Sequence, residues 1–212
     1  MGGKRSIFFD LDGTLTDPYD GIRSCIEYAL NELGQSWAAD EDFRWCIGPP
    51  LLQSFERLAG PALADDALRL YRERFSATGW RENEPYEGIH EMLDGLVQAG
   101  HTMLVATSKP TVYAEKILEH FDLARYFSGL YGPDLDGRLA DKRDLLAHIL
   151  EQEGDLIDPV MIGDRKHDMI GARHNGVATI GVLYGYGSKD ELLAAGADRL
   201  VELPAGLPAA VR

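Results

Sequence analysis

Short apolar runs recur along the chain, and segments with helical periodicity separate most of them. We expect these runs to form strands at residues 6–11, 102–107, 129–131, 159–162 and 179–183. Strands that alternate with helices in this way indicate βαβ units, in which a parallel sheet carries helices on both faces. The pattern therefore predicts an α/β fold. The first run is apolar on both faces, as is typical of a strand inside such a sheet.

Residues 17–85 interrupt this alternation, because they show helical patterning and no convincing strand. The first helix of this segment is expected to have Asp17 as its N-cap and Pro18 at its first helical position, and to end at Gly34. A second long helix is expected over residues 62–77. The segment is therefore predicted to be a small helical bundle.

The expected organisation is a core domain formed by residues 1–16 and 86–212, with residues 17–85 as an inserted domain. A chain of 212 residues with 45% hydrophobic content can bury a full core and still has room for such an insertion. The Gly- and Pro-rich end after Leu203 is expected to be a loosely held tail.

Acidic residues outnumber basic ones by 35 to 21, which gives a net charge of −14. This charge would repel nucleic acid and anionic membrane surfaces, so neither a nucleic acid polymer nor a membrane is an expected partner. Cys25 and Cys46 are the only cysteines and form no metal-ligand pattern, which favours a reducing cytoplasm. The first expected strand leaves no room for a signal peptide, and no apolar run approaches membrane-spanning length. We therefore expect a cytoplasmic protein.

Two carboxylates follow the first expected strand directly. Asp10 and Asp12 are two positions apart, and Gly13 permits a sharp turn that lets both face one cleft. Ligands bind at the carboxyl ends of strands in such sheets, which places this pair where chemistry is expected. An ordinary Asp-Gly turn capped by Thr14 explains the same residues equally well when they are considered alone.

Three further signals lie at strand ends or helix starts. Thr107 and Ser108 follow a strand where unpaired backbone N–H groups of a helix could bind phosphate, although a simple helix cap would look the same. Lys142 begins a helix, where a cation opposes the macrodipole and therefore requires an anionic partner unless it is a solvated surface residue. Asp164 and Asp168 follow another strand at a spacing that puts both on one side of a helical turn. Together they supply the residue types that phosphoryl transfer needs.

These residues carry a resemblance to the haloacid dehalogenase superfamily. The chain has its four motifs in order, namely Asp10-x-Asp12, Thr107, Lys142 and Gly163-Asp164-x-x-x-Asp168. The helical stretch between the first two motifs looks like the C1 cap of that superfamily. The resemblance covers essentially the whole chain and implies a three-layer Rossmann-like parallel sheet core with an inserted α-helical cap domain. It also implies a phosphoric monoester hydrolase.

In the phosphatases that the chain resembles, the first Asp is a covalent nucleophile, so Asp10 is implied to form an aspartyl-phosphate. Asp12 is implied to protonate the leaving alcohol and then to take a proton from water. Thr107 and Lys142 complete the implied catalytic set, and with Ser108 they would bind the phosphoryl group.

The same resemblance implies Mg²⁺ as the cofactor. Asp10, the backbone carbonyl of Asp12, and Asp164 would hold the ion, with Asp168 contacting it directly or through another group. Mg²⁺ prefers one or two carboxylates, with water and substrate phosphate as its remaining ligands.

The chain resembles two branches of the superfamily, and these branches act on different substrates. The turn at residues 47–51 and the segment 107–110 look like phosphoglycolate phosphatases, whereas residues 131–138 followed by Asp141 and Lys142 look like a bacterial 5′-nucleotidase-like branch. We expect a small phosphorylated metabolite, with phosphoglycolate ranked before nucleoside monophosphates. A phosphomutase is less favoured, because the hexose-phosphate mutases carry a catalytic His in the first cap helix and the first His here is His90.

The substrate is expected to be selected by polar residues of the helical insertion. Tyr19, Arg23 and Arg44 are the candidates, although a solvated surface role explains an Arg equally well. A non-catalytic phosphate-binding protein is a further alternative, but its expected signature, a missing nucleophile, metal carboxylate or Lys, is absent from this sequence. The expected assembly is a monomer or a homodimer.

Overall fold

The computed structural model describes residues 3–38 and 40–212. The chain divides into two compact units, one formed by the residues up to Asp17 together with Pro85–Arg212, and the other by Pro18–Glu84. The boundaries expected from the sequence differ from these by one residue at each crossing. Within the described residues, no helix is both long and apolar enough to cross a membrane.

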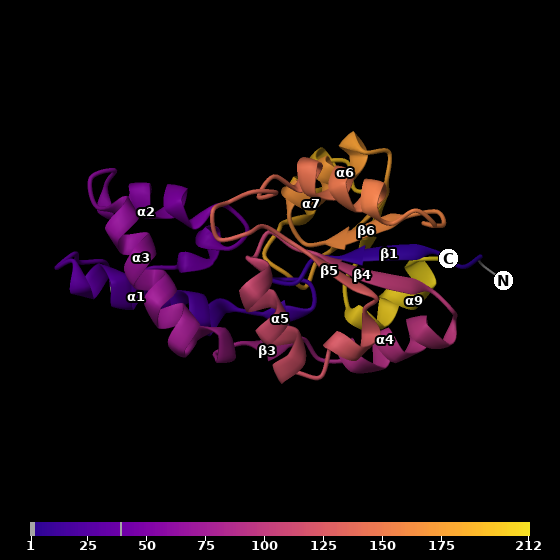
Figure 1. Cartoon of the computed structure of the whole chain (residues 1–212), viewed down its shortest axis with the longest axis horizontal. Coiled ribbons are helices and arrows are strands. Elements are labelled where there is room, and N and C mark those ends of the chain that lie inside the picture. Colours follow the sequence, from indigo (N-terminus) through magenta and orange to yellow (C-terminus); the bar gives the residue numbers. More distant parts are fainter. Residues whose placement is uncertain (1–2, 39) are drawn as a thin grey trace. The chain divides into compact units, whose positions relative to one another are not determined.

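The larger unit is built on a six-stranded sheet whose neighbouring strands are all parallel (Figure 1). In sheet order its strands are β5 (Gly129–Tyr131), β4 (Thr102–Ala106), β1 (Ser6–Phe9), β6 (Val160–Gly163), β7 (Ala178–Val182) and β8 (Arg199–Val201). The chain fills one half of the sheet from β1 outward and then the other half from β6 outward. Because the order reverses at β1, the carboxyl ends of β4, β1 and β6 border the crevice where ligands bind in such sheets.

Helices cover both faces of this sheet (Figure 1). One face carries α6 (Lys142–Gln152) and α7 (Lys166–His174), and α8 (Lys189–Ala194) packs beside α7. The opposite face carries α4 (Ile89–Gln98), α5 (Thr111–His120) and α9 (Leu207–Ala210). Alternate strand residues such as Phe8 and Met161 are fully buried against α6 and α7. The predicted α/β fold is therefore confirmed.

The C-terminal end is not a loosely held tail, and this prediction was wrong. It forms a short 3-10 helix, Pro204–Gly206, and then α9. Leu207 and Val211 are fully buried, so one side of this short helical segment anchors it to the larger unit. Proline is well tolerated in a first helical turn, which is why the Gly- and Pro-rich composition did not prevent a helix here.

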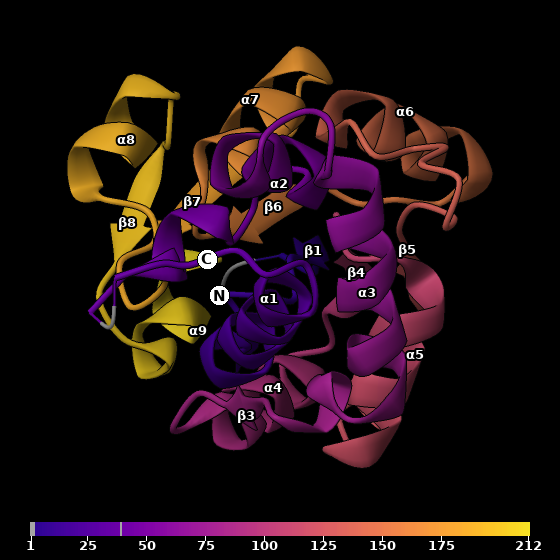
Figure 2. The same ribbon diagram turned by 90° about the vertical axis from the view of Figure 1, so that its left-hand side faces the viewer.

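The smaller unit is helical, as expected, and contains α1 (Tyr19–Glu32), α2 (Leu51–Ala59) and α3 (Ala64–Ala77), with short 3-10 helices at Phe43–Cys46 and Gly79–Arg81. Helix α3 packs against both α1 and α2 (Figure 2). Aromatic residues fill its core, where Phe55 is fully buried and Tyr71 and Phe75 stack with their ring centroids 5.5 Å apart. A unit of this size gains much of its stability from burying such large side chains.

The entry into this unit differs from the prediction. Pro18 is the N-cap residue of α1, so Asp17 does not cap the helix. Asp17 instead belongs to β2 (Thr16–Asp17), which forms a two-stranded sheet with β3 (Glu84–Pro85). The expectation that residues 17–85 contain no strand is therefore wrong at both ends, because two-residue strands leave no periodicity to detect.

Candidate active site

The centre of the site is the loop that follows β1. The backbone N–H of Asp10 donates to the Ile162 carbonyl at 2.9 Å, which continues the pairing of β1 with β6 by one residue. The chain then turns at Gly13, whose φ of 82° is in the left-handed region that favours glycine. A Cβ atom at Gly13 would lie 2.2 Å from Asp164 Oδ2, so a larger residue would also collide with the neighbouring strand end. Local geometry thus requires the glycine that follows Asp12.

Lys142 links two of the carboxylates from the first turn of α6. Its side chain is 3% exposed, and its Nζ lies 3.2 Å from Asp10 Oδ1 and 2.8 Å from Asp168 Oδ1. The same ammonium donates to the Ala106 carbonyl at 2.7 Å. Burial by itself lowers the pKa of Lys142, but Asp10 and Asp168 outweigh this effect and raise the pKa above its usual value. A buried cation therefore balances part of the negative charge at the end of the sheet.

Asp164 and Asp168 are completely or almost completely buried where β6 passes into α7. Asp164 Oδ2 accepts the Tyr186 N–H at 2.8 Å, and Asp168 Oδ2 accepts the Arg165 N–H at 3.2 Å. Burial, with repulsion from Asp168 and Asp10, raises the pKa of Asp164 well above its usual value. Burial likewise raises the pKa of Asp168 to about 6, although Lys142 opposes the shift. Both shifts have the direction expected when burial leaves a charged carboxylate incompletely compensated.

The three carboxylates form a group that fits a divalent cation. Asp10, Asp164 and Asp168 each offer an oxygen atom, and these atoms lie within 4.8 Å of one another. Within the described part of the chain, the buried Asp164 Oδ1 has no hydrogen-bond partner. A buried carboxylate oxygen without a donor is costly, and a hard cation that binds oxygen would satisfy it.

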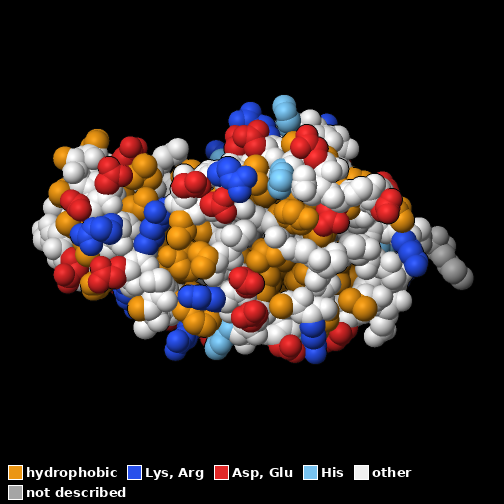
Figure 3. All heavy atoms as spheres, in the orientation of Figure 1, with side chains coloured by type: hydrophobic (Ala, Val, Ile, Leu, Met, Phe, Trp, Pro, Cys, Tyr) orange, Lys and Arg blue, Asp and Glu red, His pale blue; other side chains and the backbone are white. Residues whose placement is uncertain are grey.

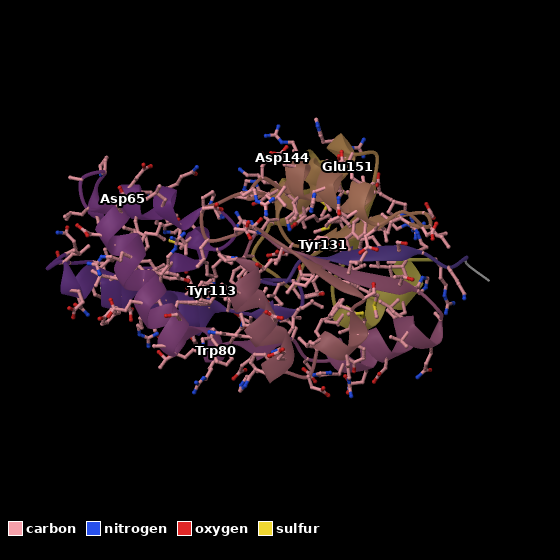
Figure 4. The ribbon with its side chains drawn as sticks, viewed as in Figure 1. Asp65, Trp80, Tyr113, Tyr131, Asp144 and Glu151 are labelled. Carbon is pink, nitrogen blue, oxygen red and sulfur yellow. The ribbon has the colours of Figure 1, made fainter. Side chains whose placement is uncertain are left out.

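Thr107 and Ser108 follow β4 beside the same edge. Thr107 is 1% exposed, and its N–H donates to the carbonyl of Tyr131, the β5 residue labelled in Figure 4, at 3.0 Å. Its Oγ1 accepts the Lys109 N–H at 3.1 Å, so the hydroxyl hydrogen remains available for donation to a ligand. Ser108 is half-buried in the turn before α5. The structure thus brings Asp10, Asp12, Thr107, Lys142, Asp164 and Asp168 to one edge of the sheet.

Lys109 belongs to this site, although the sequence analysis did not select it. Its Nζ lies 2.6 Å from Asp12 Oδ2, and the two side chains are only 6% and 18% exposed. Burial raises the pKa of Asp12, and Lys109 partly offsets this rise. A single Lys beside a helix start is usually a solvated residue, so no signal in the sequence indicated its burial.

Tyrosines surround the loop that follows β1, and sequence reasoning missed them as well. The Tyr184 hydroxyl donates to the Thr14 carbonyl at 3.0 Å, and the Tyr186 hydroxyl hydrogen-bonds to Asp17. Tyr86 meets Tyr184 edge to face, with ring centroids 5.1 Å apart. Burial and the nearby carboxylates raise the pKa of each of these phenols, which keeps them neutral hydrogen-bonding groups.

The predicted substrate-binding residues of the smaller unit interact with neighbouring side chains of that unit. The Arg44 guanidinium lies 4.6 Å from the ring centroid of Tyr19 and pairs with Asp42 at 3.3 Å. Arg23 instead pairs with Glu27 at 2.9 Å. Acidic and basic side chains are interspersed on the molecular surface in Figure 3, which is the usual setting of such pairs. Substrate binding by Tyr19, Arg23 and Arg44 stays a prediction.

Comparison with known proteins places this geometry in a family. The model of the family described as "Haloacid dehalogenase-like hydrolase" matches residues 7–182. The chain is 50% identical over 192 residues to a 5′-nucleotidase from Pseudomonas aeruginosa, covering 89% of this chain and 87% of that protein. It is 34% identical over 187 residues to a phosphoglycolate phosphatase from Agrobacterium fabrum, covering 84% of this chain and 80% of that protein.

A solved structure supports the same relationship. The fold is similar to a predicted phosphatase from Clostridium acetobutylicum with a TM-score of 0.91 and 40% identity, and the match covers 98% of both chains. The resemblance inferred from the four motifs is therefore confirmed. The chain belongs to the haloacid dehalogenase-like hydrolase family, and its relatives in that family include proteins named as phosphatases and as a 5′-nucleotidase.

Proposed function

We propose that the protein is a Mg²⁺-dependent phosphomonoester hydrolase that acts through an aspartyl-phosphate on Asp10. The observation that carries this proposal is the position of Lys142, whose buried ammonium contacts Asp10 and Asp168, two members of the acidic group that also contains Asp164. A carboxylate at a strand end, a fixed cation and a partly uncompensated acidic group are what phosphoryl transfer requires.

The metal would be held by Asp10, Asp164 and the backbone carbonyl of Asp12. Asp168 is engaged by Lys142 and by the Arg165 N–H, so we assign it the role of orienting Lys142 and supporting the acidic group. When bound, Mg²⁺ supplies positive charge that balances the phosphoryl oxygens and the buried carboxylates.

In the first step, an oxygen of Asp10 attacks phosphorus in line, and the bond between phosphorus and the leaving oxygen breaks. Asp12 transfers its proton to that leaving oxygen. The raised pKa of Asp12, caused mainly by burial, favours the protonated form that this step needs. Lys142 and the Thr107 hydroxyl donate to the phosphoryl oxygens, on which negative charge is concentrated.

In the second step, water attacks the phosphorus of the aspartyl-phosphate. Asp12, now a carboxylate, takes a proton from that water, and the bond between phosphorus and the Asp10 oxygen breaks. Phosphate and the original form of both carboxyl groups result. One carboxyl group thus acts as acid and then as base, as microscopic reversibility requires.

For the substrate we propose a small phosphorylated metabolite, with nucleoside 5′-monophosphates before 2-phosphoglycolate. The order differs from our expectation from motifs because the similarity to the Pseudomonas aeruginosa 5′-nucleotidase is greater than that to the phosphoglycolate phosphatase. Both proposals share the same chemistry at Asp10 and Asp12.

The direct test measures phosphate release from nucleoside monophosphates, 2-phosphoglycolate, sugar phosphates and pyrophosphate, with Mg²⁺ and with a chelator. Asp10→Asn keeps the shape of the side chain but removes the nucleophile, so we expect release to fall at least about 10⁴-fold. Wild-type protein quenched during turnover should carry phosphate in acid-stable, base-labile linkage at Asp10, as assigned by mass spectrometry.

Full activity of Asp10→Asn would contradict the nucleophile assignment, and turnover unaffected by chelation would contradict the metal. Substrate binding without turnover would favour a non-catalytic role. Conversion of a sugar phosphate to its isomer without phosphate release would favour a phosphomutase.

A further inference from the structure

Lys109 is a buried cation in the site that the proposed reaction leaves without a role. Its side chain is 6% exposed, and its Nζ lies 2.6 Å from Asp12 Oδ2. Lys142 has its own partners in Asp10 and Asp168, so the two lysines serve different carboxylates. A desolvated charge pair of this kind costs free energy unless its geometry is well maintained.

The backbone around Lys109 is fixed independently of Asp12. The Lys109 N–H donates to Thr107 Oγ1 at 3.1 Å, and Pro110 precedes the first turn of α5. Gly132 lies against this turn so closely that a Cβ there would be 2.8 Å from the Lys109 carbonyl oxygen and 3.1 Å from that of Thr107. The stem of Lys109 therefore starts from a constrained backbone, and the ammonium can act as a fixed reference point for its partner.

The two oxygens of Asp12 have different surroundings. Oδ2 is paired with Lys109, whereas Oδ1 is buried and has no hydrogen-bond partner among residues 3–38 and 40–212. Asp12 follows the end of β1, and its backbone forms an isolated β-bridge with Thr16 that does not involve the side chain. The contact with Lys109 distinguishes the two oxygens and leaves one of them free.

We propose that Lys109 is a positioning residue, which holds Asp12 through Oδ2 so that Oδ1 exchanges protons with the reactants. This inference rests on the proposed function, because it assigns no role to Lys109 unless Asp12 is the acid and base. In the first step the proton passes from Oδ1 to the leaving oxygen as its bond to phosphorus breaks. In the second step a water proton passes to Oδ1, and Lys109 keeps its own protons throughout.

A different role would be direct binding of the phosphoryl group by Lys109. The two roles predict different dependence on the leaving group. A poor leaving group such as the alkoxide of a nucleoside 5′-monophosphate needs a proton as it departs, whereas para-nitrophenolate departs without one. Loss of phosphoryl binding affects both substrates, but loss of Asp12 positioning affects mainly the alkyl phosphate.

The experiment compares kcat/KM for a nucleoside monophosphate and for para-nitrophenyl phosphate in Lys109→Met, Lys109→Arg and wild type. This ratio reports events up to the first irreversible step, formation of the aspartyl-phosphate, so it isolates the acid role. For Lys109→Met we expect kcat/KM to fall about 30-fold to 100-fold with the nucleotide and less than about threefold with the aryl phosphate, within the usual range of a general-acid contribution. Lys109→Arg should recover part of the loss.

Two further variants separate this inference from the proposed function. Asp12→Asn should also lose more kcat/KM with the nucleotide than with the aryl phosphate, and its loss should be larger than that of Lys109→Met. If Asp12→Asn does not show this dependence on the leaving group, the acid role of Asp12 is overturned. Lys116→Met replaces an exposed lysine of α5 and should match wild type in both assays. Circular dichroism and thermal unfolding of every variant identify those that are folded.

The positioning role is overturned if Lys109→Met loses the same factor with both substrates, which would assign Lys109 to the phosphoryl group. It is also overturned if folded Lys109→Met keeps full activity with the nucleotide while Asp12→Asn shows the leaving-group pattern. Should Lys109→Met not fold, Lys109→Arg decides: a selective loss with the nucleotide supports the role, and an equal loss with both substrates removes it.

Discussion

The charged side chains at the sheet edge of the larger unit and the predicted substrate-binding arginines of the smaller unit are held in opposite ways. At the sheet edge of the larger unit, Lys142 and Asp168 are only 3% and 1% exposed and contact each other from separate helices. In the smaller unit, Arg44 and Arg23 are 60% and 41% exposed and pair with acidic residues two and four positions away. Buried pairs depend on their exact partners, whereas exposed pairs contribute little and can be exchanged.

Under the proposed function, we expect this difference to separate the chemistry from the choice of substrate. A change among the buried charges alters the electrostatics of every reaction at the site. A change among the exposed charges alters one contact and leaves the fold intact. We therefore expect variants in the two units to differ in kind.

The largest effect is expected for Lys142→Met. The variant keeps the stem of the side chain but leaves the carboxylates of Asp10 and Asp168 facing each other without a cation. We expect kcat to fall roughly 10²–10³-fold and the free energy of unfolding at neutral pH to fall by about 3 kcal/mol. Steady-state kinetics and urea unfolding would measure the two effects.

Lys116→Met in α5 provides the matched control, because it removes an exposed lysine. Its kcat and its free energy of unfolding should equal those of wild type. The contrast between buried and exposed charges fails if both lysine variants behave alike.

A smaller effect, on stability, is expected for Asp164→Asn. Because burial raises the pKa of Asp164, the folded protein binds its proton more strongly than the unfolded chain does. Stability that depends on this group therefore falls as the pH rises from the usual carboxyl pKa through the raised one. In chelator at pH 8 the variant should be more stable than wild type by about 1–3 kcal/mol, and the difference should shrink at pH 4. Urea unfolding at both pH values measures it.

Asp198→Asn should change stability in the opposite direction. Burial raises the pKa of Asp198, but hydrogen bonds from Thr179 outweigh this effect and lower it. This carboxylate therefore stabilises the fold above its unfolded pKa, and the variant should be less stable than wild type at pH 8. If Asp164→Asn and Asp198→Asn change the free energy of unfolding at pH 8 in the same direction, the charged form of Asp164 does not destabilise the fold.

The smallest effect is expected for Arg44→Ala in the smaller unit. If Arg44 and its neighbour Tyr19 contact the leaving group of the substrate, KM for a nucleoside monophosphate should rise roughly threefold to tenfold with little change in kcat. The free energy of unfolding should stay within about 0.5 kcal/mol of wild type. Steady-state kinetics with the nucleotide and with para-nitrophenyl phosphate would check the substrate dependence.

Arg23→Ala tests the second predicted contact, and Arg69→Ala is its control, because Arg69 is an exposed arginine of α3 that the sequence does not implicate. A change in KM for Arg69→Ala equal to that for Arg44→Ala would remove the assignment of Arg44. A large loss of kcat in any of these variants would contradict the separation of chemistry from substrate choice.

The sequence predicts the elements of the larger unit well because their patterns are local. Strands β1, β4 and β5 begin where the apolar runs begin, and Lys142 starts a helix as expected. Once the strands are known to be parallel, their carboxyl ends must meet at one edge. The convergence of Asp10, Thr107 and Asp164 therefore follows from topology and strand ends alone, whereas Lys142 reaches the same edge from the first turn of α6.

Other features depend on contacts that leave no local pattern. The burial of Lys109 follows from its packing beside Asp12, and the position of Tyr184 and Tyr186 follows from the path of the chain after β7. Strand β8 was also missed, because its three residues begin with the exposed Arg199 and form no apolar run. Distant residues determine these features, so pattern reasoning on neighbours could not recover them.

The hydrogen-bond capacity of Lys142 has a consequence for the order of events. An ammonium group has three N–H bonds, and Lys142 Nζ has three close oxygen neighbours: the Ala106 carbonyl, to which it donates, and the carboxylates of Asp10 and Asp168, with which it forms ion pairs. A phosphoryl oxygen would compete with these neighbours for Lys142, and the 3.2 Å contact with Asp10 is the longest of the three. In the proposed mechanism, Asp10 loses its negative charge when it becomes an acyl phosphate and is then a weaker acceptor. We therefore expect Lys142 to turn to the transferred group once that group has left its original oxygen.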